Sequence, residues 1–288
     1  MPAVSITPTD AALGATVEGV DMRTPPDDAT IEVIETALET YGVLIFPNQI
    51  VTPAQQVTFS AALGPLELTA NIDARLDGQP EIFVVGNTGA KTVTFAPKAG
   101  SDDLEWHTDH IHRSEPSRAS LLYAKEIPEE GGDTLFACMY SAYDGLSLED
   151  KEAYGRLEAI HSVAGLRAYL RDQAEEDEYD PGRQEAMPES VTWPLVRRHP
   201  RTGRPALYFG AKITIGIRGR SREDGLRFVR ELTAHATQPA FVYRHVWRKH
   251  DAVLWDNRRA LHAATPFDME RHRRLMHRTT LRETEPVA

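Results

Sequence analysis

The segment WHTDHIH, residues 106–112, carries four side chains that can bind a metal ion or carry a proton. They are His107, Asp109, His110 and His112. In an extended segment, residues two apart project from the same face, so His107 and Asp109 point together. An imidazole nitrogen and a carboxylate oxygen on one face are adjacent ligands for a divalent first-row metal. Because a chain with 11 histidines contains H-x-D pairs by chance, this motif needs support from elsewhere.

A third candidate ligand, His262, ends the motif WDNRRALH at residues 255–262. The pattern predicts a strand ending in WDN, then a tight turn, then His262. Two histidines and one carboxylate form the facial triad of non-haem Fe(II) oxygenases, which leaves positions open for a bidentate co-substrate and dioxygen. The helical H-E-x-x-H signature of many zinc hydrolases is absent. A zinc hydrolase with the same three ligands, or a metal-stabilised binding scaffold, is the alternative from another class.

A basic strand follows in RHRRLMHRTTL, residues 271–281. Its alternation places Arg274, Met276 and Arg278 on one face. A buried arginine in a sheet needs an anionic partner, and its planar fork suits a carboxylate. The Thr134 hydroxyl in GGDTLF can donate one more hydrogen bond to that carboxylate. Neither alternative above explains such a carboxylate pocket, and so this third motif favours an oxygenase with an organic-acid co-substrate.

The composition is that of a globular enzyme with small-molecule partners. The chain has 288 residues, of which 41% are hydrophobic, and 43 acidic against 32 basic residues give a net charge of −11. Such a surface repels phosphate backbones and anionic lipid, so we expect neither nucleic acid nor membranes as partners. Cys138 is the single cysteine and the N-terminus shows no secretory pattern, so we expect a cytoplasmic protein without disulfides.

The elements that must position these residues are mostly short strands. We expect a strand pair within residues 4–21 and further strands at 42–49, 81–87, 120–127, 133–140, 205–210, 240–247, 252–257 and 274–283. Helices are expected at 29–41, 52–64, 147–160 and 221–236. No βαβ rhythm is present, which favours a jelly roll or a related sandwich with added helices.

No linker divides the chain, so residues 1–288 are expected to form one domain. Two turn-rich stretches, near 88–103 and 165–190, are either solvated loops or lids over a site, since long loops inside compact domains are often functional.

Taken together, the motifs H-T-D, G-G-D-T, W-D-N-R…H and R-x-M-H-R-x-T resemble the TauD/TfdA family of Fe(II)/2-oxoglutarate-dependent dioxygenases. The resemblance covers most of the chain, including LGATVEGVDMR near the start and WPLVRRHPRTGRPALYFG in the second half. NRRALHAATPFD and HATQPAFVYRHVW look closest to the branch that acts on aryloxyalkanoate herbicides such as 2,4-dichlorophenoxyacetate.

The resemblance implies a mostly β fold with helices and a double-stranded β-helix (jelly-roll) core. It implies Fe(II) bound by the three candidate ligands, with 2-oxoglutarate and dioxygen as co-substrates. Arg274 and Thr134 would hold the distal carboxylate of 2-oxoglutarate, and Trp255 would pack beneath the cofactor site. Arg278 would lie near the keto-acid end and the acidic group of the prime substrate. A dimer or tetramer is common in the family.

For the reaction, the resemblance implies hydroxylation of a small anionic, carboxylate-bearing substrate with release of succinate and CO₂. An aryloxyalkanoate would be cleaved to a phenol. A tailoring oxygenase acting on an acidic natural product, such as a terpenoid or amino-acid derivative, and a sulfonate dioxygenase are the alternatives. Relatives that bind a sulfonate tend to carry histidine after LG-x-L, whereas this chain reads LGPLELTANID. If Thr69 occupies that place in the substrate site, taurine is disfavoured.

The two remaining histidines of the opening segment receive different expectations. His110 follows the iron carboxylate, where small or apolar residues are usual in the family, so it would contact the substrate or hydrogen-bond a neighbour of the ligands. His112 is expected to be structural.

Overall fold

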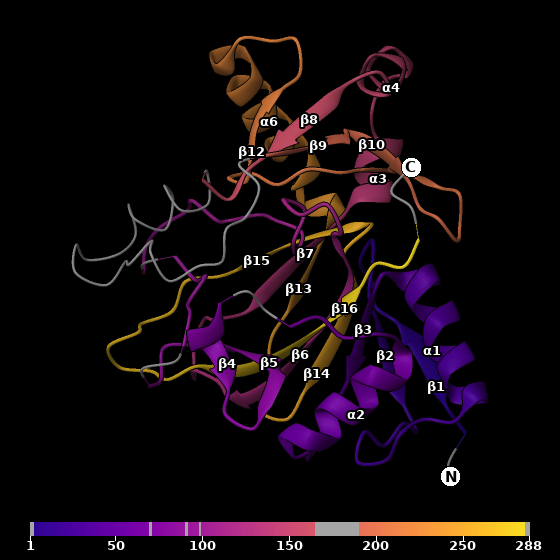
Figure 1. Ribbon diagram of the computed structural model, residues 1–288, viewed down its shortest axis with the longest axis vertical. Coiled ribbons are helices and arrows are strands. Elements are labelled where there is room, and N and C mark those ends of the chain that lie inside the picture. The colour runs from indigo at the N-terminus through magenta and orange to yellow at the C-terminus, as the bar shows by residue number, and fades with distance from the viewer. Residues whose placement is uncertain (1–2, 69–70, 90–91, 98, 165–189, 286–288) are drawn as a thin grey trace.

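One large antiparallel sheet forms the base of the molecule (Figure 1). The computed structural model describes residues 3–68, 71–89, 92–97, 99–164 and 190–285. The sheet has eight strands, and only β2 and β3 pair in parallel. In spatial order they are β1 (Ser5–Pro8), β2 (Ala15–Glu18), β3 (Val43–Phe46), β14 (Ala252–Asp256), β6 (Ser117–Glu126), β16 (Leu275–Arg282), β5 (Gln79–Gly86) and β4 (Arg75–Leu76).

Two helices cover one face of this sheet, α1 (Asp28–Tyr41) and α2 (Pro53–Leu63). Each begins at a side-chain cap, because Asp27 accepts from the backbone of Thr30 and Thr52 forms a reciprocal capping box with Gln55. Apolar side chains from both helices and the sheet form one buried cluster, which includes Ile34, Leu38, Phe46, Phe59, Leu63, Leu121, Leu254 and Leu281. The helices expected at 29–41 and 52–64 are confirmed.

A three-stranded sheet packs against the opposite face and encloses the main core. Its order is β13 (Val242–His245), β7 (Thr134–Cys138) and β15 (Ala260–Ala264). Phe136 on β7 lies 5.6 Å from Trp255 on β14, measured between ring centroids, so the two sheets are in direct contact. Other core residues shared between the sheets are Phe83, Leu122, Val253, Leu261, Ala263 and Met276.

A third group of elements caps one end of this sandwich, at the top of Figure 1. It contains a sheet of β12 (Thr214–Ile217), β8 (Glu158–His161) and β9 (Val191–Pro194) and a hairpin of β10 (Val196–Arg198) and β11 (Pro205–Leu207). The helices there are α3 (Met139–Asp144), α4 (Leu148–Tyr154) and α6 (Arg222–Ala236). Two 3₁₀ turns, η1 (Ile72–Ala74) and η3 (Pro239–Phe241), complete the described elements.

Two expected elements are wrong in part. The helix expected at 147–160 ends at Tyr154, because Gly155 caps it through a hydrogen bond to Lys151, and β8 follows. In β8, Ala159 and His161 are buried while their neighbours are partly exposed, a period of two that overrides the helical pattern. The strand expected at 133–140 ends at Cys138, where α3 begins.

The mostly β fold with helices is confirmed. Within the described part of the chain, no helix is long and apolar enough to cross a membrane. Of the two stretches considered as lids, residues 165–189 lie outside the described residues.

Candidate active site

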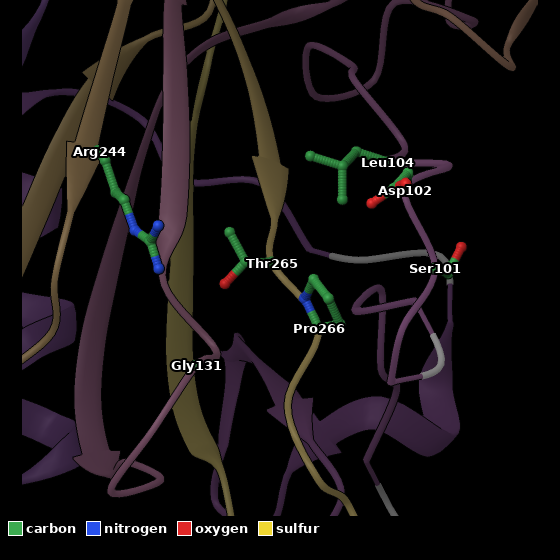
Figure 2. Close-up of a pocket in the computed structure, with 7 residues that line it drawn as sticks. All are labelled: Ser101, Asp102, Leu104, Gly131, Arg244, Thr265 and Pro266. Atoms are coloured by element: carbon green, nitrogen blue, oxygen red, sulfur yellow. The ribbon is translucent and has the colours of Figure 1, made fainter.

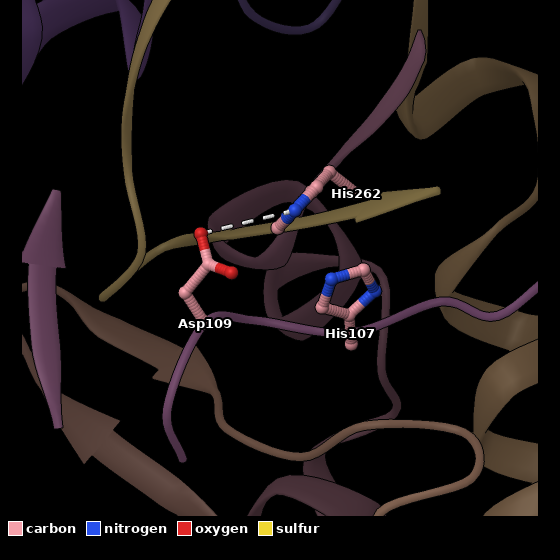
Figure 3. Close-up of side chains that lie close together, drawn as sticks. All are labelled: His107, Asp109 and His262. Atoms are coloured by element: carbon pink, nitrogen blue, oxygen red, sulfur yellow. Dashed lines mark ion pairs between the residues drawn. The ribbon is translucent and has the colours of Figure 1, made fainter. Parts of the chain in front are cut away.

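The three candidate ligands meet in one place between the sheets (Figure 3). His107, Asp109 and His262 each present a ligand atom within 4.8 Å of the others, and no second group of this kind occurs among the residues that the structure describes. A backbone bridge joins the two histidines, since the amide of each donates to the carbonyl of the other at 3.0 and 2.8 Å. Their ring centroids lie 4.1 Å apart, so two residues from opposite halves of the sequence share one site.

The donor set has the atoms and charges that a divalent metal needs. Nδ1 of His107 donates to the carbonyl of Glu105 at 2.9 Å, which leaves Nε2 as the ligand nitrogen. Nε2 of His262 lies 3.9 Å from Oδ2 of Asp109. Burial and the neighbouring His107 keep the pKa of His262 well below its ordinary value, so its ring is neutral. Neutral imidazoles and an ionised carboxylate are the forms that bind metal.

Both oxygens of Asp109 are hydrogen-bonded. Oδ1 accepts from Arg278 at 2.5 Å, and Oδ2 accepts from the Ser120 hydroxyl at 2.6 Å. Burial alone would raise the pKa of Asp109, but the positive charge of Arg278, with His262 and His107 close by, holds it below the ordinary range. Asp109 is therefore a permanently charged group at neutral pH.

Asn257 connects the ligand loop to β14. Its Oδ1 accepts from the Trp255 indole at 2.9 Å and from the Asp109 amide at 3.3 Å. Its Nδ2 donates to the Ser120 hydroxyl at 3.1 Å. The Trp255 ring in turn lies 4.7 Å from the His262 ring, and its place beneath a bound cofactor stays a prediction. Sequence reasoning missed Ser120 and Asn257 as contributors, although Asn257 stands in the WDN motif that located His262.

Arg274 and Thr134 lie at one end of the small sheet. Thr134 is on β7, where the register pairs it with Ala264 and pairs Phe136 with His262. Arg274 is 3% exposed, and its Nε donates to the carbonyl of Gly132 at 3.0 Å. Its two terminal nitrogens have no acceptor among the described residues, so they are available to a carboxylate. Burial lowers the pKa of Arg274 to about 10, which leaves the side chain charged at neutral pH.

Two local features shape this end of the site. Gly132 has a φ of 67°, which other residues rarely adopt, and a Cβ there would lie 2.8 Å from Cγ of Pro128 and 3.3 Å from Cδ of Arg274, so this position favours glycine. The Thr134 hydroxyl accepts from the Trp247 indole at 2.9 Å. Because the indole nitrogen only donates, the Thr134 O–H is left free to donate to a ligand. Trp247 was not singled out by the sequence.

A cavity of about 320 Å³ opens beside the segment that leads into β7 (Figure 2). Its lining residues are Ser101, Asp102, Leu104, Gly131, Arg244, Thr265 and Pro266. Arg244 is engaged by Asp133 at 2.6 Å, and Thr265 donates its backbone N–H to the carbonyl of the same residue. The cavity thus adjoins the turn at Gly131 and Gly132 that supports Arg274.

The remaining predicted site residues have separate surroundings. Nδ1 of His110 lies 2.8 Å from Oε2 of Glu67 and 2.7 Å from the Ser117 hydroxyl, so the ring is held by groups outside the metal cluster. The buried His112 ring meets that of His110 edge-on at 6.1 Å. Thr69 lies outside the described residues. Contact of His110 or Thr69 with substrate stays a prediction.

Part of the 88–103 stretch packs against the site. Val93 forms a backbone bridge with Val85 on β5, and the Phe95 ring lies 6.0 Å from the His107 ring. Its role as a lid stays a prediction.

Comparisons with known proteins agree with this geometry. The sequence model of the taurine catabolism dioxygenase TauD, TfdA family matches residues 5–280. An (S)-phenoxypropionate/alpha-ketoglutarate-dioxygenase of Sphingobium herbicidovorans is 34% identical over 96% of this chain and 94% of its own length. An alpha-ketoglutarate-dependent 2,4-dichlorophenoxyacetate dioxygenase of Cupriavidus pinatubonensis is 32% identical over 95% and 96%.

A solved structure extends the likeness to three dimensions. The crystal structure of AAD-2 in complex with Mn(II) and N-oxalylglycine is 31% identical, with a TM-score of 0.80 over 99% of this chain and all of that chain. Because the family match and the relatives span nearly the whole sequence, the chain belongs to the taurine catabolism dioxygenase TauD, TfdA family and is an oxidoreductase of the dioxygenase class.

Proposed function

We propose that this dioxygenase oxidises a small carboxylate-bearing substrate, with an aryloxyalkanoate as the leading class. The enzyme depends on Fe(II), 2-oxoglutarate and dioxygen. The observation that carries the proposal is the largely buried His107–Asp109–His262 cluster with a charged arginine beside it, because it combines an open metal site with a group for an anion. The two relatives named above, which are named for phenoxypropionate and 2,4-dichlorophenoxyacetate, supply the substrate class.

His107, Asp109 and His262 are proposed to hold Fe(II), and the chain's own groups fit it in charge and number. Bound Fe(II), with 2-oxoglutarate and dioxygen, supplies the oxidising power of the reaction. Arg274 and Thr134 are proposed to bind the distal carboxylate of 2-oxoglutarate, since a buried guanidinium with free terminal nitrogens and a free O–H suit a carboxylate.

Three residues are proposed to act on the prime substrate. Arg278 carries a positive charge beside Asp109 and has a buried Nε without a hydrogen-bond partner in the described structure, so it can bind a substrate carboxylate. His110 and Thr69 are proposed to border the substrate. Trp255 closes the floor beneath His262 and keeps water away from the ligand ring.

The products follow from the position of oxidation. Hydroxylation of the carbon that joins the ether oxygen to the carboxylate side of an aryloxyalkanoate gives a hemiacetal, which breaks down to a phenol and an oxo acid. In the same turnover 2-oxoglutarate loses CO₂ and becomes succinate, so one atom of dioxygen enters succinate and the other enters the hydroxylated substrate. In this proposal Arg274 positions 2-oxoglutarate, Arg278 positions the substrate carboxylate, and the two sheets exclude bulk solvent.

The proposal also covers the core fold, the domain organisation, the oligomeric state and the location of the protein. Two facing antiparallel sheets around the metal cluster support a double-stranded β-helix (jelly-roll) core. Residues 1–288 would form a single domain with lids near 88–103 and 165–190. A homo-oligomer, dimer or tetramer, and a cytoplasmic location stay predictions made from the sequence.

The test is succinate release by enzyme loaded anaerobically with Fe(II) and then mixed with 2-oxoglutarate and oxygen. A panel of aryloxyacetates, aryloxypropionates, taurine and terpenoid acids would be compared, with phenol measured in parallel. Strong stimulation by an aryloxyalkanoate, with phenol equal to succinate, supports the proposal. Stimulation by a terpenoid acid or a sulfonate instead would overturn the substrate class, and no 2-oxoglutarate consumption would overturn the reaction.

A pair of histidine variants tests the metal site in the same assay. His262→Ala removes a proposed ligand and should abolish succinate formation. His235→Ala, on the remote helix α6, should retain it. Succinate formation by the His262 variant at the wild-type rate would place the third ligand elsewhere.

A further inference from the structure

The geometry assigns a new role to two residues, Ser120 and Asn257: we infer that they are positioning residues that orient the Asp109 carboxylate so that it binds the metal through Oδ2. The inference rests on the proposed function, because it assumes that Asp109 is a metal ligand. It concerns a relay of hydrogen bonds from β14 through Asn257 and Ser120 to Asp109.

The direction of each hydrogen bond in the relay can be assigned. The Trp255 indole can only donate, and it lies 2.9 Å from Oδ1 of Asn257, so the amide nitrogen must face Ser120. That nitrogen donates to the Ser120 hydroxyl at 3.1 Å. A hydroxyl has a single proton, and an incoming donor leaves the Ser120 O–H directed at Oδ2 of Asp109, 2.6 Å away.

The surroundings hold this relay in one arrangement. Ser120 is fully buried on β6, where the strand register sets it opposite Trp255 on β14. The backbone carbonyl of Asn257 accepts from the Thr108 hydroxyl at 2.6 Å, and its Oδ1 also accepts from the Asp109 amide at 3.3 Å. Asn257 therefore contacts the chain on both sides of the ligand carboxylate.

The arrangement distinguishes the two oxygens of Asp109. Oδ1 is used by Arg278 at 2.5 Å. Oδ2 receives the Ser120 proton and is the oxygen that lies 3.9 Å from Nε2 of His262. Each oxygen accepts one hydrogen bond and so keeps a lone pair, but Oδ1 is held by the cationic Arg278 while Oδ2 faces His262, so the relay favours Oδ2 as the ligand oxygen. The same Asn257 oxygen holds the Trp255 ring that packs on His262, so one amide supports two ligands.

A merely structural role is the competing explanation, since any fully buried hydroxyl can stabilise the fold. Ser60 on α2 offers a matched comparison, because it is also fully buried and its hydroxyl lies 2.7 Å from that of Thr279, away from the metal cluster. Ser60→Ala deletes the same atom with the same burial but leaves Asp109 unaffected.

The experiment measures Mn(II) affinity by electron paramagnetic resonance of free Mn(II), together with thermal unfolding of the metal-free proteins. Ser120→Ala should weaken Mn(II) binding by about 10- to 100-fold, the range seen when a hydrogen-bond partner of a metal ligand is removed. Ser60→Ala should bind Mn(II) as the wild type does, even if its unfolding temperature falls. Ser120→Thr keeps the hydroxyl and should restore most of the affinity.

Asn257→Ala gives a second, independent measurement if Ser120→Ala folds poorly. It frees the Ser120 proton to rotate and should weaken Mn(II) binding as well, and adding Asn257→Ala to Ser120→Ala should have little further effect, because the hydroxyl that Asn257 orients is then gone. Equal Mn(II) affinity in wild type, Ser120→Ala and Asn257→Ala would overturn the inference. Asp109→Ala separates the two levels: if it too binds Mn(II) normally, the proposed metal site itself is wrong, and if it alone loses Mn(II), only the relay is wrong.

Discussion

Arg278 and Asp109 form a buried ion pair inside the candidate metal site, with NH1 of the arginine 2.5 Å from Oδ1 of the carboxylate. The side chains are 9% and 4% exposed, so solvent screens the pair very little. The arginine plane also lies over the Phe83 ring, with Cζ 4.8 Å from the ring centroid. The positive charge of a proposed substrate-binding residue, Arg278, therefore neutralises the negative charge of a proposed metal ligand, Asp109.

Arg278→Gln should raise the acid limit of metal binding, which is the pH below which the site releases its metal. Burial raises the pKa of Asp109 and Arg278 counteracts it, so without the arginine the carboxylate takes up a proton at a higher pH. The same charge lowers the pKa of His262, which would also rise. Protonation of either ligand releases metal, so the Mn(II) dissociation constant measured from pH 4 to 8 should show the shift.

Arg282→Gln is the control for this shift, because Arg282 ends the same strand with 52% of its side chain exposed and pairs with Glu115. The two substitutions remove the same charge. A pH profile that moves equally in both variants would mean that net charge, rather than the Asp109 pair, sets the acid limit.

Arg274→Ala should raise the KM for 2-oxoglutarate by about 30-fold or more, since losing a desolvated charge pair costs roughly 2–5 kcal/mol. The maximal rate at saturating co-substrate should fall much less. Arg271→Ala removes a nearby arginine that is 82% exposed and should leave KM unchanged. Succinate formation against 2-oxoglutarate concentration measures both values, and an unchanged KM for Arg274→Ala would reassign the anchor.

Trp247→Phe should raise the KM for 2-oxoglutarate about fivefold, because the Thr134 hydroxyl loses the donor that directs its proton, a loss of roughly 1 kcal/mol. Thr134→Val should have a similar or larger effect. In a double variant the tryptophan substitution should add nothing, since the hydroxyl that it orients is gone. Additive effects of the two substitutions on KM would show that Trp247 acts independently of Thr134.

Asp256→Asn should cost about 3–5 kcal/mol of unfolding free energy at pH 7, as expected when one member of a buried ion pair is removed. Asp256 is fully buried, and its carboxylate accepts two hydrogen bonds from the Arg258 guanidinium, one from the Arg258 backbone amide and one from His199. Burial raises the pKa of Asp256, but Arg258 and His199 hold it well below the ordinary value. Its stabilisation is therefore present above about pH 4, the pKa of the unfolded chain, and is lost as the pH falls further.

The measurement is urea unfolding from pH 7 downward, in which the gap between wild type and Asp256→Asn should narrow below about pH 4. Asp21→Asn is a close control, since Asp21 makes the same paired contact with Arg23 two residues later but is 39% exposed. Solvent screening should leave that variant near wild type. A pH-independent gap for Asp256→Asn would assign its effect to packing instead of charge.

Local chemistry determined much of this protein from the sequence alone. The extended H-x-D spacing put His107 and Asp109 on one face, since alternation along a strand depends only on backbone geometry. The caps at Asp27 and Thr52 made α1 and α2 predictable for the same reason, because their partners are three residues away. The prediction of a helix over 147–160 was wrong after Tyr154, because Gly155 ends α4 and β8 follows although the helical sequence pattern continues.

Only the tertiary structure decided which distant residues complete the site. Strand pairing set His262 beside His107, and the β6–β14 register set Ser120 beside Trp255 and so brought its hydroxyl to Asp109. His110 is the clearest case, since its position in the motif left a substrate contact and a hydrogen bond to a neighbour of the ligands both open, and the fold set its Nδ1 beside Glu67 and Ser117. A serine or an asparagine carries no signal of its partner in sequence, because the partner is selected by the register of strands that are far apart in the chain.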